Sequence, residues 1–355
     1  ELQGIGWKTI ARLASLPVPL SQAVQMKASE LAALGIPRQK AEQIKQQLTL
    51  DFIRQRQALY AKHHIGVLTI SDEGYPPMLR EIAQPPWVLY YKGRAELFME
   101  PAIAVVGTRN PTVYGRKMAY RLSRQLAEGG FVIVSGLARG IDGISHLAAL
   151  ESGGATIGVT AGGLDFIYPK EHAPLYRTIS EEGLIVSEFP LGTQIRKGMF
   201  PLRNRIIAGL SSGTVVVEGG LDSGSLITAE IALEESRDVF AVPGQVTSPK
   251  SAGALTLLKD GAKIVISAQD IFEEYAHKIT LNPKNITRDQ SKVEMSRHEE
   301  EILQYIAFEP VTFDEILRRS GSSFGHLHSV LLSLLIKNKI EQLPGSRYIR
   351  TDGHH

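Results

Sequence analysis

Short apolar segments rich in β-branched residues alternate with longer amphipathic segments over residues 101–275. Several of the short segments are apolar almost throughout, which is typical of strands buried on both faces of a sheet. The pattern predicts strands at 103–106, 131–134, 156–159, 184–186, 214–217, 239–242 and 263–266. It predicts helices between them, among others at 114–127, 141–151 and 226–235. This alternation indicates an α/β fold with a doubly wound, mostly parallel sheet.

Apolar residues at helical spacing mark a separate module at 1–62. Two similar phrases, Gly4-Ile5-Gly6 and Gly35-Ile36-Pro37, each precede an amphipathic segment, as in a SAM or helix-hairpin-helix domain. The glycines of such hairpins let backbone N–H groups approach a phosphate. Because Pro37 has no N–H group, we expect this module to pack within the protein rather than to contact DNA.

The rest of the chain divides by polarity and period. Residues 61–100 form an irregular bridge with one short strand at 88–91, and we place an α/β domain at 63–275. The polar stretch 276–295 indicates a linker. Residues 296–350 carry three apolar helical stripes and a hairpin, which resembles a winged helix, and 351–355 are a tail or tag remnant. The expected recognition helix at 323–337 has little positive charge in its front half, which favours protein contact or packing over base readout.

Composition narrows the classes of function. The 355 residues carry a net charge of only +2, so any affinity for nucleic acid must come from a local patch. The chain has no cysteine, which excludes disulfides and thiol catalysis and fits a reducing compartment. No apolar run is long enough to span a bilayer and no signal peptide is visible, so we expect a cytoplasmic protein without a membrane partner. His63 and His64 have no third ligand at metal-binding spacing.

Glycines gather in the loops that follow the predicted strands. These loops are 107–111, 135–140, 161–165, 187–190 and 218–220. Ligands of open parallel sheets bind outside the carboxyl ends of the strands, where glycines allow close approach and helix N-termini face anions. Five such loops, two of which also carry an arginine, predict one shared anion-binding crevice.

A basic stretch at 195–210 adjoins these loops. It gathers Arg196, Lys197, Arg203 and Arg205 around Phe200 without an acid. Cations beside an exposed aromatic ring at a helix entrance suit an anion with a flat face, such as a nucleotide or a chain of nucleotides. The alternative is a solvated basic loop with Phe200 in the core.

Motifs for other chemistry are missing. The sequence has no G-x-G-x-x-G, no P-loop and no G-x-S-x-G elbow. Asp142 and His146 stand four residues apart on one predicted helix, where a cap and a local hydrogen bond explain them better than catalysis does. We therefore expect no cofactor, no metal and no catalytic residue.

Eight ordered phrases in the α/β domain resemble the DNA-processing protein A family, also called DprA or Smf. They are VVGTRNP at 105–111, VSGLARGID at 134–142, GGLDFIYP at 162–169, SEFPLG at 187–192, FPLRNRIIAGLS at 200–211, VVVE at 215–218, SGSLITAEIALE at 223–234 and VFAVPG at 239–244. The resemblance implies a Rossmann-like domain between a small helical N-terminal domain and a small winged-helix C-terminal domain. It implies a dimeric, non-enzymatic protein that binds single-stranded DNA, protects incoming strands and helps load RecA recombinase in natural transformation. Single-strand-binding protein is a further expected partner.

The resemblance also implies site residues. Arg109 should hold a phosphate, Lys197 should contact the backbone, and Phe200 should stack on a base. The remaining DNA-binding residues implied by the motifs are Arg203, Asn204, Thr108, Gly136, Gly162 and Ser187. The sequence departs from the family pattern at His172, Asp222 and Ala254, and Asp222 puts one secondary phosphate contact in doubt.

Two other functions remain open at this point. The segment around Glu218-Gly219-Gly220 resembles a nucleotide phosphoribohydrolase of the lysine-decarboxylase-like type, with Glu218 or Glu230 as the acid. The Gly-Gly-x-Gly-Thr phosphate loop of that class is absent, which argues against it. A purely structural dimer scaffold would leave the crevice and its cations without a ligand.

Overall fold

The chain forms two compact units in a computed structural model, Glu1–Lys284 and Asn285–His355. The structure describes residues 2, 4–16, 22, 25–277, 297–307, 310–322, 327, 330, 331, 334, 339–343 and 347–350. The predicted linker at 276–295, apart from its first two residues, and the tail at 351–355 lie outside the described residues. The domain boundaries inferred from the sequence stay predictions, since the N-terminal helices and the sheet fall in one unit.

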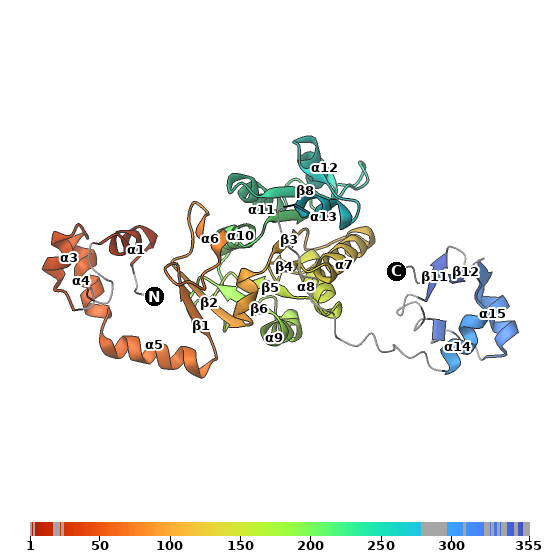
Figure 1. Ribbon diagram of the computed structural model, residues 1–355, viewed down its shortest axis with the longest axis horizontal. Coiled ribbons are helices and arrows are strands. Elements are labelled where there is room, and N and C mark those ends of the chain that lie inside the picture. Colours follow the sequence, from red (N-terminus) through yellow and green to blue (C-terminus); the bar gives the residue numbers. More distant parts are fainter. Residues whose placement is uncertain are drawn as a thin grey trace. The chain divides into compact units, whose positions relative to one another are not determined.

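A nine-stranded sheet forms the centre of the first unit (Figure 1). Its strands in spatial order are β1 (Gly66–Thr69), β2 (Val88–Gly93), β6 (Leu184–Ser187), β5 (Thr156–Val159), β4 (Val132–Ser135), β3 (Ala102–Val106), β7 (Gly213–Val216), β8 (Asp238–Ala241) and β9 (Lys263–Ile264). The pairs from β6 to β9 are parallel, and β2 pairs antiparallel with both β1 and β6. The predicted doubly wound, mostly parallel sheet is therefore confirmed.

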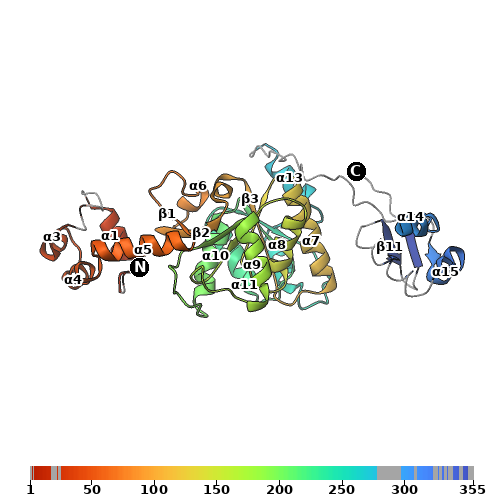
Figure 2. The same cartoon turned by 90° about the horizontal axis from the view of Figure 1, so that it is seen from below.

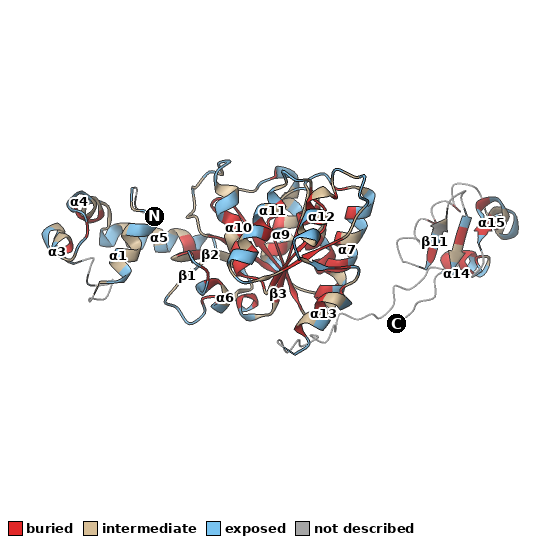
Figure 3. Cartoon of the chain, turned by 90° about the horizontal axis from the view of Figure 1, so that it is seen from above, coloured by how far each residue is buried: buried red, intermediate tan, exposed pale blue. Residues whose placement is uncertain are grey.

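Alternate residues of each strand enter different apolar cores. In β3, Ala104 and Val106 join one cluster while Ile103 and Val105 join the other. The side-chain period of two produces this division, and it explains why these strands are apolar at nearly every position. Burial colouring shows the central strands buried along their length (Figure 3).

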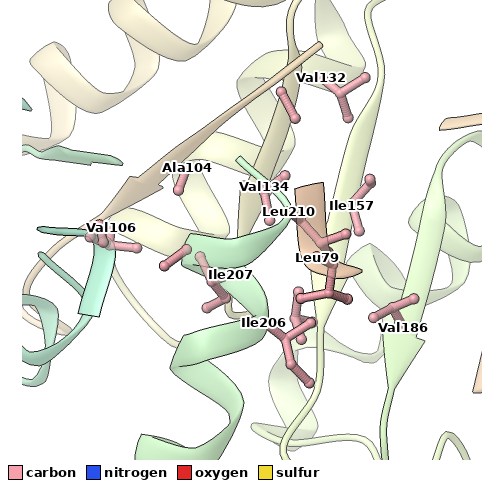
Figure 4. Packing of buried hydrophobic residues seen from close by; sticks show 14 of the residues in the cluster. Leu79, Ala104, Val106, Val132, Val134, Ile157, Val186, Ile206, Ile207 and Leu210 are labelled. Atoms are coloured by element: carbon pink, nitrogen blue, oxygen red, sulfur yellow. The ribbon is translucent and has the colours of Figure 1, made fainter. Parts of the chain in front are cut away.

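Helices cover both faces of the sheet. Helices α6 (Pro77–Arg80), α10 (Met199–Gly209), α11 (Gly224–Glu234) and α12 (Ala252–Lys259) pack on one face. Helices α7 (Val113–Glu128), α8 (Ile141–Glu151), α9 (Ala173–Glu182) and α13 (Gln269–Tyr275) pack on the other (Figure 2). Ile206, Ile207 and Leu210 hold α10 and the turn after it against the strands (Figure 4). This packing fixes the helix that carries the predicted basic stretch.

The strand order reverses between β3 and β7. The chain proceeds from β3 through β4 and β5 to β6 on one side, and from β7 through β8 to β9 on the other. The carboxyl ends of β3 and β7 therefore diverge at a topological switch point, the usual ligand site of such sheets.

The bridge at 61–100 is more regular than the sequence indicates. It contains the edge strand β1, the short helix α6 and a 3-10 helix at Ala95–Met99. The expectation of an irregular segment was therefore wrong. The strand β1 was hard to predict, because it is four residues long and alternates between half-buried and exposed positions. Such a short edge strand carries little apolar signal.

The N-terminal region is helical, with α1 (Trp7–Ala14), α3 (Ala28–Ala33), α4 (Arg38–Gln47) and α5 (Leu50–Lys62). Leu31, Ile36 and Ile44 form the centre of its small core. Gly4 and Gly35 have φ values of +77° and +90°, so the two similar phrases form turns that favour glycine. No helix in the described part of the chain is long and apolar enough to cross a bilayer.

The second unit contains α14 (Arg297–Gln304), β10 (Val311–Thr312), α15 (Phe313–Ser320), β11 (Ile340–Leu343) and β12 (Arg347–Arg350). Its strands form an antiparallel sheet in the order β10-β12-β11, which includes the predicted hairpin. The predicted helix at 323–337 lies outside the described residues except for four buried leucine and valine positions, Leu327, Val330, Leu331 and Leu334. Its charge pattern therefore remains a sequence prediction.

Candidate nucleic-acid interface

A cleft of about 740 Å³ lies at the switch point. The loops after β3, β4 and β7 line it together with the first turns of α10 and α11. Four of the predicted residues contribute to its wall, namely Thr108, Arg109, Phe200 and Asn204, and Arg203 lies at its base. Side chains from distant parts of the sequence thus meet where the sheet topology places ligands.

Arg203 holds the base of the cleft together. Its side chain is only 5% exposed. One terminal nitrogen donates to the carbonyl oxygens of Gly136 and Val159, the latter at 2.6 Å, and Nε donates to Asn204 Oδ1 at 3.2 Å. Burial lowers the pKa of Arg203 to about 10, with Asp142 opposing the shift, so the side chain remains a cation at neutral pH.

Asp142 lines the cleft from the first turn of α8, and the buried His146 lies on the same helix outside the lining. Burial raises the pKa of Asp142, and the charge of Arg203 opposes this shift. His146 Nδ1 lies 2.6 Å from Thr156 Oγ1, which donates to the carbonyl of Ile133. Nδ1 must therefore carry the proton, and burial lowers the pKa of His146 to about 3, so the ring is neutral. Both groups are bonded within the fold and support the loops above them.

The exposed Arg109 and the half-buried Phe200 form the rim of the cleft. The guanidinium carbon of Arg109 lies 5.6 Å from the centroid of the Phe200 ring, within cation–π range. In the described part of the chain neither Arg109 nor Lys197 forms an ion pair with an acid. Lys197 is exposed just before α10 and does not line the cleft itself. The rim therefore offers positive charge without an ion-pair partner beside an aromatic ring, and the exposed Asp222 lines the same cleft from the loop after β7.

Glu218 fixes the loop that carries Arg109. Its buried carboxylate accepts hydrogen bonds from Thr112 N at 2.8 Å and Thr112 Oγ1 at 2.7 Å, and its carbonyl accepts from Thr108 N at 2.7 Å. Thr112 in turn caps α7 by accepting from Gly115 N. The loop after β3 is thus held to the end of β7 before any ligand arrives.

Comparison with known proteins shows the family to which the chain belongs. Residues 66–276, more than half of the chain, match the sequence model of DNA recombination-mediator protein A. The chain belongs to this family. Residues 287–346 match the DprA winged helix domain, which agrees with the described strands and helices of the second unit.

Individual relatives cover most of the chain. It is 48% identical to the DNA processing protein DprA of Bacillus subtilis over 218 residues, which span 61% of this chain and 73% of the relative. It is 36% identical to the protein Smf of Synechocystis over 316 residues, which span 80% of this chain and 79% of the relative.

Two solved structures of the family share the fold. DprA from Streptococcus pneumoniae matches with a TM-score of 0.67 and 38% identity, over 77% of this chain and 94% of that one. DNA processing protein A from Helicobacter pylori, whose structure concerns its single-stranded DNA binding mode, matches with a TM-score of 0.54 and 33% identity, over 60% and 95%.

Three of the predicted DNA-binding residues lie below the surface of the cleft. Ser187 is fully buried, and its hydroxyl donates to the carbonyl of Gly162 at 2.7 Å and accepts from Phe189 N at 2.9 Å. Gly162 and Gly136 are buried as well, and a Cβ at Gly136 would lie 2.6 Å from the Arg203 guanidinium carbon. These residues shape the loops and do not line the cleft, so of the five predicted loops those after β3, β4 and β7 line it, and Pro249 from the loop after β8 joins them.

The two acids expected for the alternative function, a nucleotide phosphoribohydrolase, do not face the cleft. Both carboxylate oxygens of Glu218 are bonded to Thr112, and Glu230 points to solvent from α11 outside the cleft. Neither carboxylate is free to act on a nucleotide in the cleft.

Arg205, in contrast to the exposed Lys197, forms a half-buried ion pair with Glu188 and adds no free charge.

One exposed aromatic residue beside the cleft has no assigned role in the sequence interpretation. Tyr168 belongs to the phrase GGLDFIYP in the loop after β5, and its ring centroid lies 5.8 Å from that of Phe200. An aromatic residue before a proline in a loop is a weak signal, and only its position beside Phe200 draws attention to it.

Proposed function

We propose that the cleft binds single-stranded DNA and that the protein protects incoming strands and helps load RecA recombinase during natural transformation. The observation that carries the proposal is the unpaired Arg109 guanidinium over the Phe200 ring at the rim of the cleft. A cation with an aromatic face suits a phosphate next to a base. Family membership and the strand-binding relative from Helicobacter pylori support the same reading.

The proposed role of each residue depends on whether its side chain is accessible at the cleft or buried beneath it. Arg109 and Lys197 bind phosphates, Phe200 stacks on a base, and Thr108 contacts the strand from the cleft wall. Arg203 and Asn204 keep the base of the cleft in shape. Gly136, Gly162 and Ser187 act indirectly, by fixing the loops, instead of donating to DNA as the motifs imply.

The proposed partners extend this function. RecA recombinase and single-strand-binding protein meet incoming strands in the cytoplasm, where we place the protein, and the binding is non-enzymatic and needs no cofactor. We also propose a homodimer. Strand β9 ends the sheet, and Ile264 and Ile266 beside its outer edge are 53% and 62% exposed, which suits pairing with a second copy.

A salt series with labelled single-stranded and duplex oligonucleotides tests DNA binding. Each phosphate that the protein neutralises contributes a slope of about −0.7 in log K against log salt for single strands. Arg109→Ala should weaken binding and flatten the slope by about 0.7. Phe200→Ala should weaken binding by roughly 1–3 kcal/mol and leave the slope unchanged.

Arg177→Ala is the matched control, since Arg177 is an exposed arginine on α9 outside the cleft. If the alanine variants of Arg109, Lys197 and Phe200 all bind with the parental affinity, the proposed site is wrong. If the parent binds duplex more tightly than single strands, the proposed strand specificity is wrong. Release of free base from nucleoside monophosphates would instead support the phosphoribohydrolase. RecA loading is measured as filament assembly on strands covered with single-strand-binding protein.

A further inference from the structure

Tyr168 presents an aromatic ring to solvent beside Phe200. The residue is 52% exposed, and its hydroxyl forms no hydrogen bond with the described residues. Its ring plane is inclined by 54° to that of Phe200, with the centroids 5.8 Å apart. Neither burial nor hydrogen bonding thus explains why a large ring lies here, which leaves its exposed face available to a ligand.

Hydrogen bonds between two loops hold this ring in place. Gly163 N donates to the carbonyl of Thr193 at 2.9 Å, and Gly192 N donates to the Asp165 carboxylate at 3.0 Å. These bonds tie the loop after β5, which carries Tyr168, to the loop after β6, which leads into α10 and Phe200. The two rings are therefore positioned before a ligand binds, which reduces the entropy lost on binding.

The inclination of the rings determines how bases can use them. A single base cannot lie parallel to both rings, so the pair does not form a sandwich. The rings instead form a bent apolar surface that suits one base on each. Arg109, above the Phe200 ring, and Lys197, on the loop before it, place positive charge near the phosphates that would join such bases.

We propose that Tyr168 is a second base-stacking residue, so that two bases of a single strand rest on Phe200 and Tyr168. This proposal rests on the proposed function and adds a subsite to it. Stacking uses the ring face and not the hydroxyl, so the subsite accepts any base, and the strand bends where it passes from one ring to the other.

The test compares Tyr168→Ala and Tyr168→Phe with the full-length parent on a labelled single-stranded oligonucleotide. Tyr168→Ala should lower affinity by about 5- to 150-fold, the range that corresponds to loss of one stacked base, with an unchanged salt slope. Tyr168→Phe keeps the ring and should bind as the parent does. Leu147→Ala, which removes a 45% exposed side chain from α8, is the matched control and should have no effect.

A second strand separates stacking from a structural role. On an oligonucleotide with abasic spacers in place of its bases, the parent and Tyr168→Ala should bind equally, because no base is present to stack. A loss that persists on the abasic strand overturns the proposal, as does parental affinity of Tyr168→Ala on the ordinary strand. In either case a loss in Arg109→Ala leaves DNA binding at the cleft standing, whereas failure of the parent to bind single strands overturns both proposals.

Discussion

At the scale of single residues, the site separates into buried groups that hold the cleft and exposed groups that face a ligand. Arg203, Asp142 and His146 are all buried, and each forms hydrogen bonds to the loop after β4 or to the ends of β5. A buried charge is costly unless it is paired, which explains why Arg203 and Asp142 occur together. Binding is left to the exposed Arg109 and Lys197 and to the half-buried Phe200, whose ring lies beside Arg109 and Tyr168.

His146 should make the stability of the first unit depend on pH. Its pKa is about 3 in the folded protein against 6.5 for the free side chain, so below pH 6.5 the unfolded chain binds a proton that the folded one does not. Stability is therefore present above pH 6.5 and is lost as pH falls toward 3, by about 2 kcal/mol at pH 5. Thermal melting at pH 7 and pH 5 measures this loss.

The variants for this measurement are His146→Gln and His63→Gln. The first removes the buried imidazole and should show a smaller drop in melting temperature between the two pH values. The second replaces an exposed histidine and should keep the parental drop. The same drop in both variants would mean that other groups cause the acid sensitivity.

At the scale of elements, the cleft depends on close contact between the loop after β3 and the start of α8. Gly140, the residue before α8, has φ +76°, and a Cβ there would lie 2.6 Å from the carbonyl oxygen of Arg109. Gly140→Ala therefore strains its own backbone and displaces the Arg109 loop. We expect it to lower stability by more than about 1 kcal/mol and to weaken binding of single-stranded DNA.

Gly261→Ala is the control for strain alone. Gly261 has φ +103°, but no atom would lie within 4 Å of its added Cβ, and it follows the end of α12, outside the residues that line the cleft. It should lose stability and keep DNA affinity, as measured by denaturation and by anisotropy titration. An equal loss of affinity in both variants would show that stability alone controls binding.

The elements were predictable where burial dominates. Helix α8 begins and ends where the sequence pattern places it, and the long apolar strands shift by only one or two residues. The loops were not, because a glycine or serine after a strand can face the ligand or the core with the same sequence. Ser187 faces the core, and no pattern in the chain reveals that Arg203 turns inward to two carbonyls whereas Arg109 stays exposed. These outcomes depend on which loops meet, which is a property of the folded sheet.

At the scale of the whole molecule, the proposed dimer should depend on the open edge of the sheet. Ile264 lies on β9 with 53% of its surface exposed, and its strand pairs with β8 on one side only in the described part of the chain. A long polar side chain with a charge blocks pairing at such an edge. Ile264→Lys should therefore sediment as a monomer, whereas the parent should sediment as a dimer.

The charge-matched control is Leu147→Lys, on an exposed face of α8 away from β9. It should sediment as the parent does. The cleft lies within one copy of the chain, so the Ile264→Lys monomer should still bind a short single strand at one site. On a long strand the monomer should bind more weakly than the dimer. In a dimer, binding of the strand at one cleft raises its effective concentration at the second cleft. Loss of short-strand binding in this variant would mean instead that the second copy contributes to the cleft itself.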